Sequence, residues 1–113
     1  MDVNDWVEEF PAAVTVCDAD GRILSMNRRS AETFAAEGGK ALIGRSLLDC
    51  HPEPARSHLA GMLVNPKLNA YTIEKNGVKK LIYQAPWFQD GAYAGYVELS
   101  LPVPAEMSHF VRQ

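Results

Sequence analysis

One continuous stretch, residues 14–63, restricts the fold of this chain more than any other part of the sequence. It opens with VTVCDADGRILSMNRRSAETF, which has the pattern of a strand, a tight turn, a second strand and a helix. The turn falls at residues 18–21, where Gly21 can adopt the positive φ that such a hairpin turn needs. Asn27 stands where the second strand gives way to the helix, a position that favours a short polar cap. The stretch therefore predicts a β-hairpin followed directly by a capped helix.

The rest of the chain has the pattern of further helices and three more strands. A second long helix opens at Pro52, where a missing N–H costs nothing, and runs to about Leu63. The Asn76-Gly77 pair is a strong hairpin signal between two later strands. Strands that precede and follow a run of helices favour an α+β fold, with the helices on one face of an antiparallel sheet. We expect helices over residues 2–10, 28–36 and 52–63, and strands over residues 13–17, 22–26, 70–75, 79–88 and 94–101.

The composition is that of one domain that folds without a metal or a disulfide framework. A chain of 113 residues buries roughly two thirds of its unfolded surface. The net charge is −3 and the basic residues are scattered, which argues against nucleic acid or a membrane as the partner. Cys17 and Cys50 alone form no disulfide framework, so we expect a cytoplasmic protein. The expected divisions of the single domain over 1–113 are a flanking helix (1–11), a core (12–103) and a tail (104–113).

The order and spacing of several residues within 12–103 resemble those of a PAS domain, a small sensory α/β module. The resemblance implies a five-stranded antiparallel sheet in the order 2-1-5-4-3, with helices packed on one face. It also implies signal transmission to a partner protein, and no nucleophile–base pair in the sequence indicates an enzyme. The residues that carry the resemblance are Asp18, Gly21, Ile23, Asn27, Phe34, Gly44 and Pro86.

The resemblance further implies a ligand pocket between the sheet and the helices, for a small apolar or amphipathic molecule. In PAS relatives, strand residues with the parity of Pro86 face this pocket. Gln84 has that parity and would then hydrogen-bond a ligand; the alternative is that it faces solvent or satisfies a neighbouring backbone group. The expected pocket residues are Phe34, His51, His58, Ile82, Gln84, Val97 and Leu99.

The Cys50-His51-Pro52 segment, together with His58, offers an alternative as a haem or metal sensor, because thiolates and imidazoles bind such metals. His51 and His58 are about 10 Å apart along a helix axis, too far for one ion, so no metal site is expected. The helix resembles the one that carries the axial histidine in oxygen-sensing haem PAS domains. That position falls on Leu59, which is turned about 100° from His58, so haem is disfavoured. The Cys-His-Pro segment resembles a PAS subgroup that has no agreed ligand.

A flavin photosensor of the same fold would carry an Asn-Cys-Arg-Phe-Leu-Gln run just after a glycine such as Gly44. Here Gly44 is followed by Arg-Ser-Leu-Leu-Asp. A leucine therefore stands where the reactive cysteine should be, and Cys50 comes three residues late. Flavin photochemistry is not expected.

The strand predicted over residues 79–88 is apolar on both faces. One face should pack on the helices, and the other needs cover from the N-terminal segment or from a second subunit. We expect a homodimer whose face includes Trp6, Phe10, Tyr83 and Trp87. A ligand-free interaction module that acts through this face is the third hypothesis for function.

Overall fold

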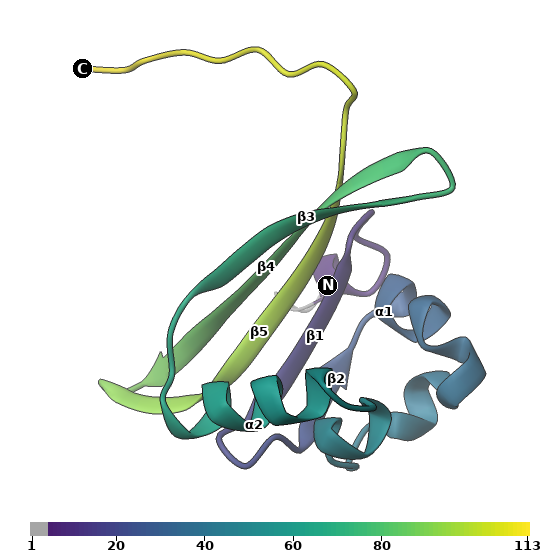
Figure 1. Cartoon of the computed structure of the whole chain (residues 1–113), viewed down its shortest axis with the longest axis vertical. Helices are drawn as coiled ribbons and strands as arrows, with labels where there is room; N and C mark the ends of the chain where they lie inside the picture. Colours follow the sequence, from purple (N-terminus) through teal and green to yellow (C-terminus); the bar gives the residue numbers. More distant parts are fainter. Residues whose placement is uncertain (1–4) are drawn as a thin grey trace.

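The computed structural model describes residues 5–113 and contains one antiparallel sheet of five strands, in the order β2-β1-β5-β4-β3 (Figure 1). The order is the one that the PAS resemblance implies, and the α+β class is the one that the sequence pattern favours, so both predictions are confirmed. The last two strands are long and form the centre of the twisted sheet with β1. The strands are β1 (Ala13–Asp18), β2 (Ile23–Met26), β3 (Asn69–Lys75), β4 (Val78–Gln89) and β5 (Ala92–Val103).

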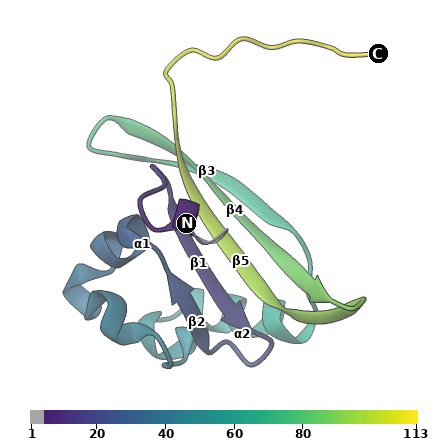
Figure 2. The same ribbon diagram turned by 180° about the vertical axis from the view of Figure 1, so that it is seen from behind.

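The helices between β2 and β3 lie on one face of the sheet, here called the inner face, and the opposite face is called the outer face. The view from behind shows the sheet in front of these helices (Figure 2). Two of them are α-helices and three are short 3-10 helices that wrap around the edge of the sheet. The helices are α1 (Arg28–Thr33), η2 (Ala35–Glu37), η3 (Gly39–Leu42), η4 (Leu47–Cys50) and α2 (Ala55–Val64).

The turn between β1 and β2 forms where the sequence predicts it. One carboxylate oxygen of Asp18 accepts hydrogen bonds from the backbone N–H groups of Asp20 and Arg22, each at 2.9 Å. Gly21 has a φ of 85°, in the left-handed region that favours glycine. The Arg22 guanidinium donates to the Gly44 carbonyl oxygen, and thereby ties the turn to the loop before η4.

The core lies between the inner face and the helices, in two clusters. One cluster joins the sheet to α2 and contains Cys17, Met62, Leu63 and Tyr96. The other joins β2 to η3 and contains Ile23, Met26 and Leu42. Leu47 of η4 packs against both clusters and so connects them.

Gly95 in β5 occupies a point where the backbones of β1 and β5 approach too closely for a side chain. Its φ is +147°, and a Cβ atom there would overlap the carbonyl oxygen of Cys17 and the backbone of Asp18. The indole Nε1 of Trp87, which is paired with Gly95, donates to the same Cys17 carbonyl oxygen at 3.0 Å. β4, β5 and β1 are therefore joined by a side chain as well as by their backbone ladder.

Three predicted helices differ from the observed ones, and the first of them falls partly outside the described residues. The helix expected over 28–36 ends at Thr33, and the 3-10 helix η2 follows it. The helix expected over 2–10 is a single 3-10 turn, η1 (Asp5–Val7), in the part that the structure describes, and residues 1–4 lie outside that part. The helix expected from Pro52 begins at Ala55, because residues 51–54 still run as loop and turn. The tail after β5 extends away from the domain without helix or strand structure (Figure 1). Within residues 5–113, no helix has the length and apolar character to cross a membrane.

Candidate functional site

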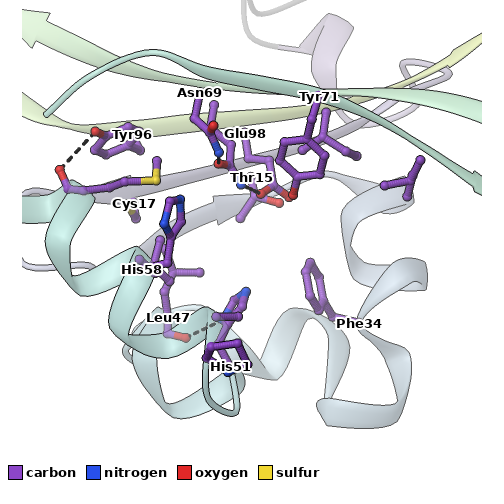
Figure 3. Close-up of a pocket in the computed structure, with 17 residues that line it drawn as sticks. Thr15, Cys17, Phe34, Leu47, His51, His58, Asn69, Tyr71, Tyr96 and Glu98 are labelled. Atoms are coloured by element: carbon purple, nitrogen blue, oxygen red, sulfur yellow. Dashed lines mark hydrogen bonds between the residues drawn. The ribbon is translucent and has the colours of Figure 1, made fainter.

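A cavity of about 780 Å³ lies between the inner face of the sheet and the helices η4 and α2 (Figure 3). Its lining combines apolar side chains with a few polar groups, which is the usual character of a small-molecule site. The apolar part comes mainly from the helices, and the polar part comes mainly from the sheet. The lining residues include Thr15, Cys17, Phe34, His51, His58, Leu59, Asn69, Tyr71, Ile82, Gln84, Tyr96 and Glu98.

A row of polar side chains crosses the sheet wall of the cavity at one level. Asn69 of β3 is paired with Gln84 of β4, and Gln84 is paired with Glu98 of β5. The Asn69 amide donates to Gln84 Oε1 at 2.8 Å, and Gln84 Nε2 donates to Glu98 Oε2 at 2.7 Å. Both ends of the Gln84 amide are therefore engaged, and its role is to hold the Glu98 carboxylate in place.

The row continues into β1, where Thr15 is paired with Glu98. Thr15 Oγ1 lies 2.5 Å from the hydroxyl oxygen of Ser30, which is fully buried in α1. The Ser30 backbone N–H donates at 3.0 Å to Asn27 Oδ1. A hydrogen-bonded path thus leads from the cavity wall into the start of α1.

Asn27 is the predicted cap of α1, and all of its side-chain hydrogen-bonding groups have partners. Besides Ser30, its Oδ1 accepts from the Val14 backbone N–H at 2.9 Å. Its Nδ2 donates to the carbonyl oxygens of Val7 at 2.9 Å and Ala12 at 2.8 Å. The cap prediction is confirmed, and the same side chain also fastens the N-terminal segment to the domain.

The side of the cavity formed by η4 and α2 carries two histidines, His51 of the Cys-His-Pro segment and His58 of α2. His51 Nδ1 lies 2.7 Å from the carbonyl oxygen of Leu47, so this nitrogen carries a proton and donates. In the neutral ring the other nitrogen, Nε2, is then a hydrogen-bond acceptor. His58, a predicted pocket residue, lines the cavity together with its neighbour Leu59.

Aromatic and thiol groups complete the lining. Figure 3 shows the rings of Phe34 and Tyr71 on one side of the cavity and His58 on the other. Burial raises the pKa of the Tyr71 phenol, and the nearby Glu98 carboxylate raises it further. Burial also raises the pKa of the Cys17 thiol, so this cysteine is a poor nucleophile at neutral pH.

Tyr96 closes the end of the cavity near the C-terminus of α2. Its hydroxyl oxygen lies 3.0 Å from the Met62 carbonyl oxygen and 3.1 Å from the Lys67 carbonyl oxygen. The same oxygen accepts from the Lys67 backbone N–H at 2.8 Å. The connection from α2 to β3 is thereby fixed to the centre of the sheet.

Five of the predicted pocket residues lie at the cavity and two do not. The five are Phe34, His51, His58, Ile82 and Gln84. The prediction that Val97 and Leu99 line the pocket is wrong. They are paired with Val16 and Val14 and alternate with the lining residues Tyr96 and Glu98, so they belong to the outer face.

Glu98, Tyr71 and Thr15 line the cavity but are not among the predicted pocket residues. The prediction placed Val97 and Leu99 of the last strand at the pocket, whereas the structure places Tyr96 and Glu98 there. The signal that could have revealed this is Gln84. Directly paired residues of neighbouring strands lie on the same face of a sheet. If Gln84 faces the pocket, its partner in β5, Glu98, must face it too.

The four residues predicted for a dimer face lie in different settings. Tyr83 is on the outer face and 37% exposed, while Trp87 is half-buried against β1. Trp6 is 59% exposed and its ring meets that of Phe10 edge to face. Figure 2 shows the N-terminal segment on the outer side of the sheet, near β1 and β5.

The residues at the cavity do not fit haem or a single metal ion. Among the described residues, no group of three or more His, Cys, Asp or Glu side chains is placed to hold a metal. His58 could supply an axial ligand to haem iron. The lining, however, contains no lysine or arginine for the two propionates, and its one formally charged side chain is the carboxylate of Glu98.

The fold and the cavity together define a small α+β domain with a cavity between its sheet and its helices. The sequence profile described as the PAS fold matches residues 7–64, more than half of the chain. This chain therefore belongs to the PAS fold family. None of the curated protein sequences compared with it matches.

Solved structures of PAS-domain and sensor proteins from two bacteria share this fold. The PAS domain of Bordetella pertussis BvgS is 20% identical, with a TM-score of 0.63 over 87% of this chain and 81% of that chain. The Vibrio cholerae Aer2 receptor, described as a dual PAS-heme oxygen sensor, is 13% identical, with a TM-score of 0.64 over 82% and 95%. A sensory box sensor histidine kinase of Vibrio cholerae is 15% identical, with a TM-score of 0.61 over 87% and 86%. At these identities the likeness concerns the fold.

Proposed function

We propose that this chain is a sensory module that binds a small ligand in the cavity and transmits a change in packing to a partner protein. The observation that carries the proposal is the cavity itself, since about 780 Å³ of space with convergent polar groups has the dimensions of a small-molecule site. Membership of the PAS fold family and the sensor proteins among its structural neighbours support the sensory role.

A route for transmission runs from the cavity to the N-terminal segment. It follows the hydrogen bonds from Thr15 to Ser30, then to Asn27, and from Asn27 to the carbonyl oxygen of Val7. On the surface, Glu8 and Glu9 of the same segment pair with Lys40 and Arg28 at 2.6 Å and 3.1 Å. A ligand that prefers one position of Thr15 would therefore bias the position of this segment.

We propose binding rather than catalysis for the cavity. The thiol that faces it, Cys17, is buried and has a raised pKa, which opposes the formation of a thiolate nucleophile.

Native mass spectrometry of the protein purified from cells tests the proposal. We expect additional mass on the folded species, whose value distinguishes a haem, a flavin, a lipid and a metabolite. A bare mass, followed by no binding of any compound from a metabolite library in a thermal-shift screen, would contradict it. A retained haem that is lost in the His58→Ala variant would instead support the haem alternative.

The outer face favours a second candidate function, dimerisation. Leu81, Val97, Leu99 and Leu101 are half-buried on this face, and contiguous apolar surface of this kind marks interaction sites. We propose that a second copy of the chain covers it, with Tyr83 at the contact. Analytical ultracentrifugation should show a dimer that Leu99→Glu dissociates, while Leu24→Glu on the edge strand β2 does not. A wild-type monomer at high concentration would refute this candidate.

A further inference from the structure

We infer that the cavity selects a ligand that carries a protonated amine on an aromatic or aliphatic body. The inference rests on the proposed ligand-binding function and concerns the chemistry of the same site. It follows from the charge, the free hydrogen-bonding groups and the ring faces that the lining presents.

Glu98 is the one lining residue with a formal charge when the imidazoles are neutral. Its Oε2 accepts from Gln84, and no group of the described residues donates a hydrogen bond to its Oε1. Arg28 pairs with Glu9 and Lys40 pairs with Glu8, away from the cavity, and no cation of residues 5–113 lies within ion-pair distance of Glu98. A half-buried carboxylate without a counter-ion is costly, and a cationic ligand would relieve that cost.

The row of polar side chains fixes where such a cation would bind. Because Asn69 holds Gln84, and Gln84 holds Glu98, the carboxylate is presented toward the cavity in one orientation before a ligand arrives. A preorganised acceptor loses little entropy on binding, so its hydrogen bond to an ammonium group contributes strongly.

The other lining groups suit the same ligand. His51 presents an acceptor nitrogen, because its Nδ1 is committed to the Leu47 carbonyl oxygen. The faces of Phe34 and Tyr71 border the cavity and attract cations as well as apolar bodies. An anionic ligand would meet Glu98 with no lysine or arginine in the lining to offset the repulsion.

Three probes that share one body and differ in head group test this inference: 2-phenylethylamine, 2-phenylethanol and phenylacetate. Each is titrated into the ¹⁵N-labelled full chain at pH 7.5 and followed by NMR. We expect the amine to bind about tenfold or more tightly than the alcohol, with shifts at Glu98, Gln84 and Thr15, and phenylacetate to bind weakest. Glu98→Gln should abolish the preference for the amine, whereas the control Glu74→Gln, on the exposed end of β3, should keep it.

The outcomes separate this inference from the proposed function. Equal binding of amine and alcohol, tighter binding of phenylacetate, or an unchanged preference in folded Glu98→Gln would overturn the inference. A neutral or anionic ligand retained from cells would also overturn it and would leave the sensory function standing. Far-UV circular dichroism establishes that each variant is folded; if Glu98→Gln does not fold, Gln84→Leu serves in its place, because it frees Glu98 from its partner and should weaken the preference.

Discussion

The hydroxyl oxygen of Tyr96, in the middle of the sheet, accepts a hydrogen bond from the backbone N–H of Lys67 at 2.8 Å. Lys67 lies in the connection between α2 and β3, so this contact fixes the end of the helical layer to the strand that carries Glu98. Tyr93, whose ring meets that of Tyr96 edge to face, has a buried hydroxyl without a hydrogen-bond partner among the described residues. The two tyrosines therefore allow a matched comparison between a hydrogen-bonded hydroxyl and one without a partner.

We expect Tyr96→Phe to lower the free energy of unfolding by about 1–3 kcal/mol, because it leaves the backbone groups of Lys67 and Met62 without their partner. Tyr93→Phe removes a buried hydroxyl that has no partner, so the free energy of unfolding should stay the same or rise by up to about 1 kcal/mol. Urea denaturation of both variants measures the difference. A larger loss for Tyr93→Phe than for Tyr96→Phe would contradict the assignment.

The cap of α1 can be separated from the link to the N-terminal segment with two substitutions at Asn27. Asn27→Ala removes all four hydrogen bonds and should cost about 2–4 kcal/mol. Asn27→Asp keeps the oxygen that caps α1 but removes the donor to Val7 and Ala12. Hydrogen exchange should then quicken in residues 5–12 and stay slow in α1. Equal quickening in both would show that the two functions of this side chain are inseparable.

Gly95→Ala and Gly61→Ala should have opposite effects on stability. A Cβ at Gly95 would overlap the Cys17 carbonyl oxygen and the Asp18 backbone, so this substitution should cost more than about 3 kcal/mol or prevent folding. At Gly61, within α2, a Cβ meets nothing within 4 Å, and alanine should add about 0.5–1 kcal/mol. Thermal unfolding measures both; a fully stable Gly95→Ala protein would refute the close approach of β1 and β5.

The raised pKa of Cys17 predicts that stability falls as the solution becomes alkaline. Below the ordinary thiol range both folded and unfolded chains are protonated at this residue, so it adds no pH dependence. Above about pH 8.5 the unfolded chain ionises while burial keeps the folded thiol neutral. Unfolding is then increasingly favoured. Urea denaturation between pH 7.5 and 9.5 should show this slope in the wild type and a flatter one in Cys17→Ala, and identical slopes would contradict it.

The strands and turns were predictable from local signals, whereas the strand order came from the PAS resemblance, because the β1–β5 pairing is long-range. The Asp18 turn, the Asn27 cap and the Asn76-Gly77 turn each specify a backbone conformation within a few residues. The start of α2 was placed three residues early, since Pro52 suits the first turn of a helix but the chain turns again before Ala55. Glu98 was missed for a different reason, because alternation shows which residues share a face but not which face is inside.

The inner and outer faces of the sheet draw on different positions of the same strands. In β4 and β5 the even-numbered residues Ile82, Gln84, Tyr96 and Glu98 border the cavity, while their odd-numbered neighbours form the opposite surface. What the domain recognises and what the sheet packs against can therefore vary independently by single substitutions. A relative with this backbone could acquire a new ligand preference through Gln84 and Glu98 alone, without rebuilding the surface on which Tyr83 and Leu99 lie.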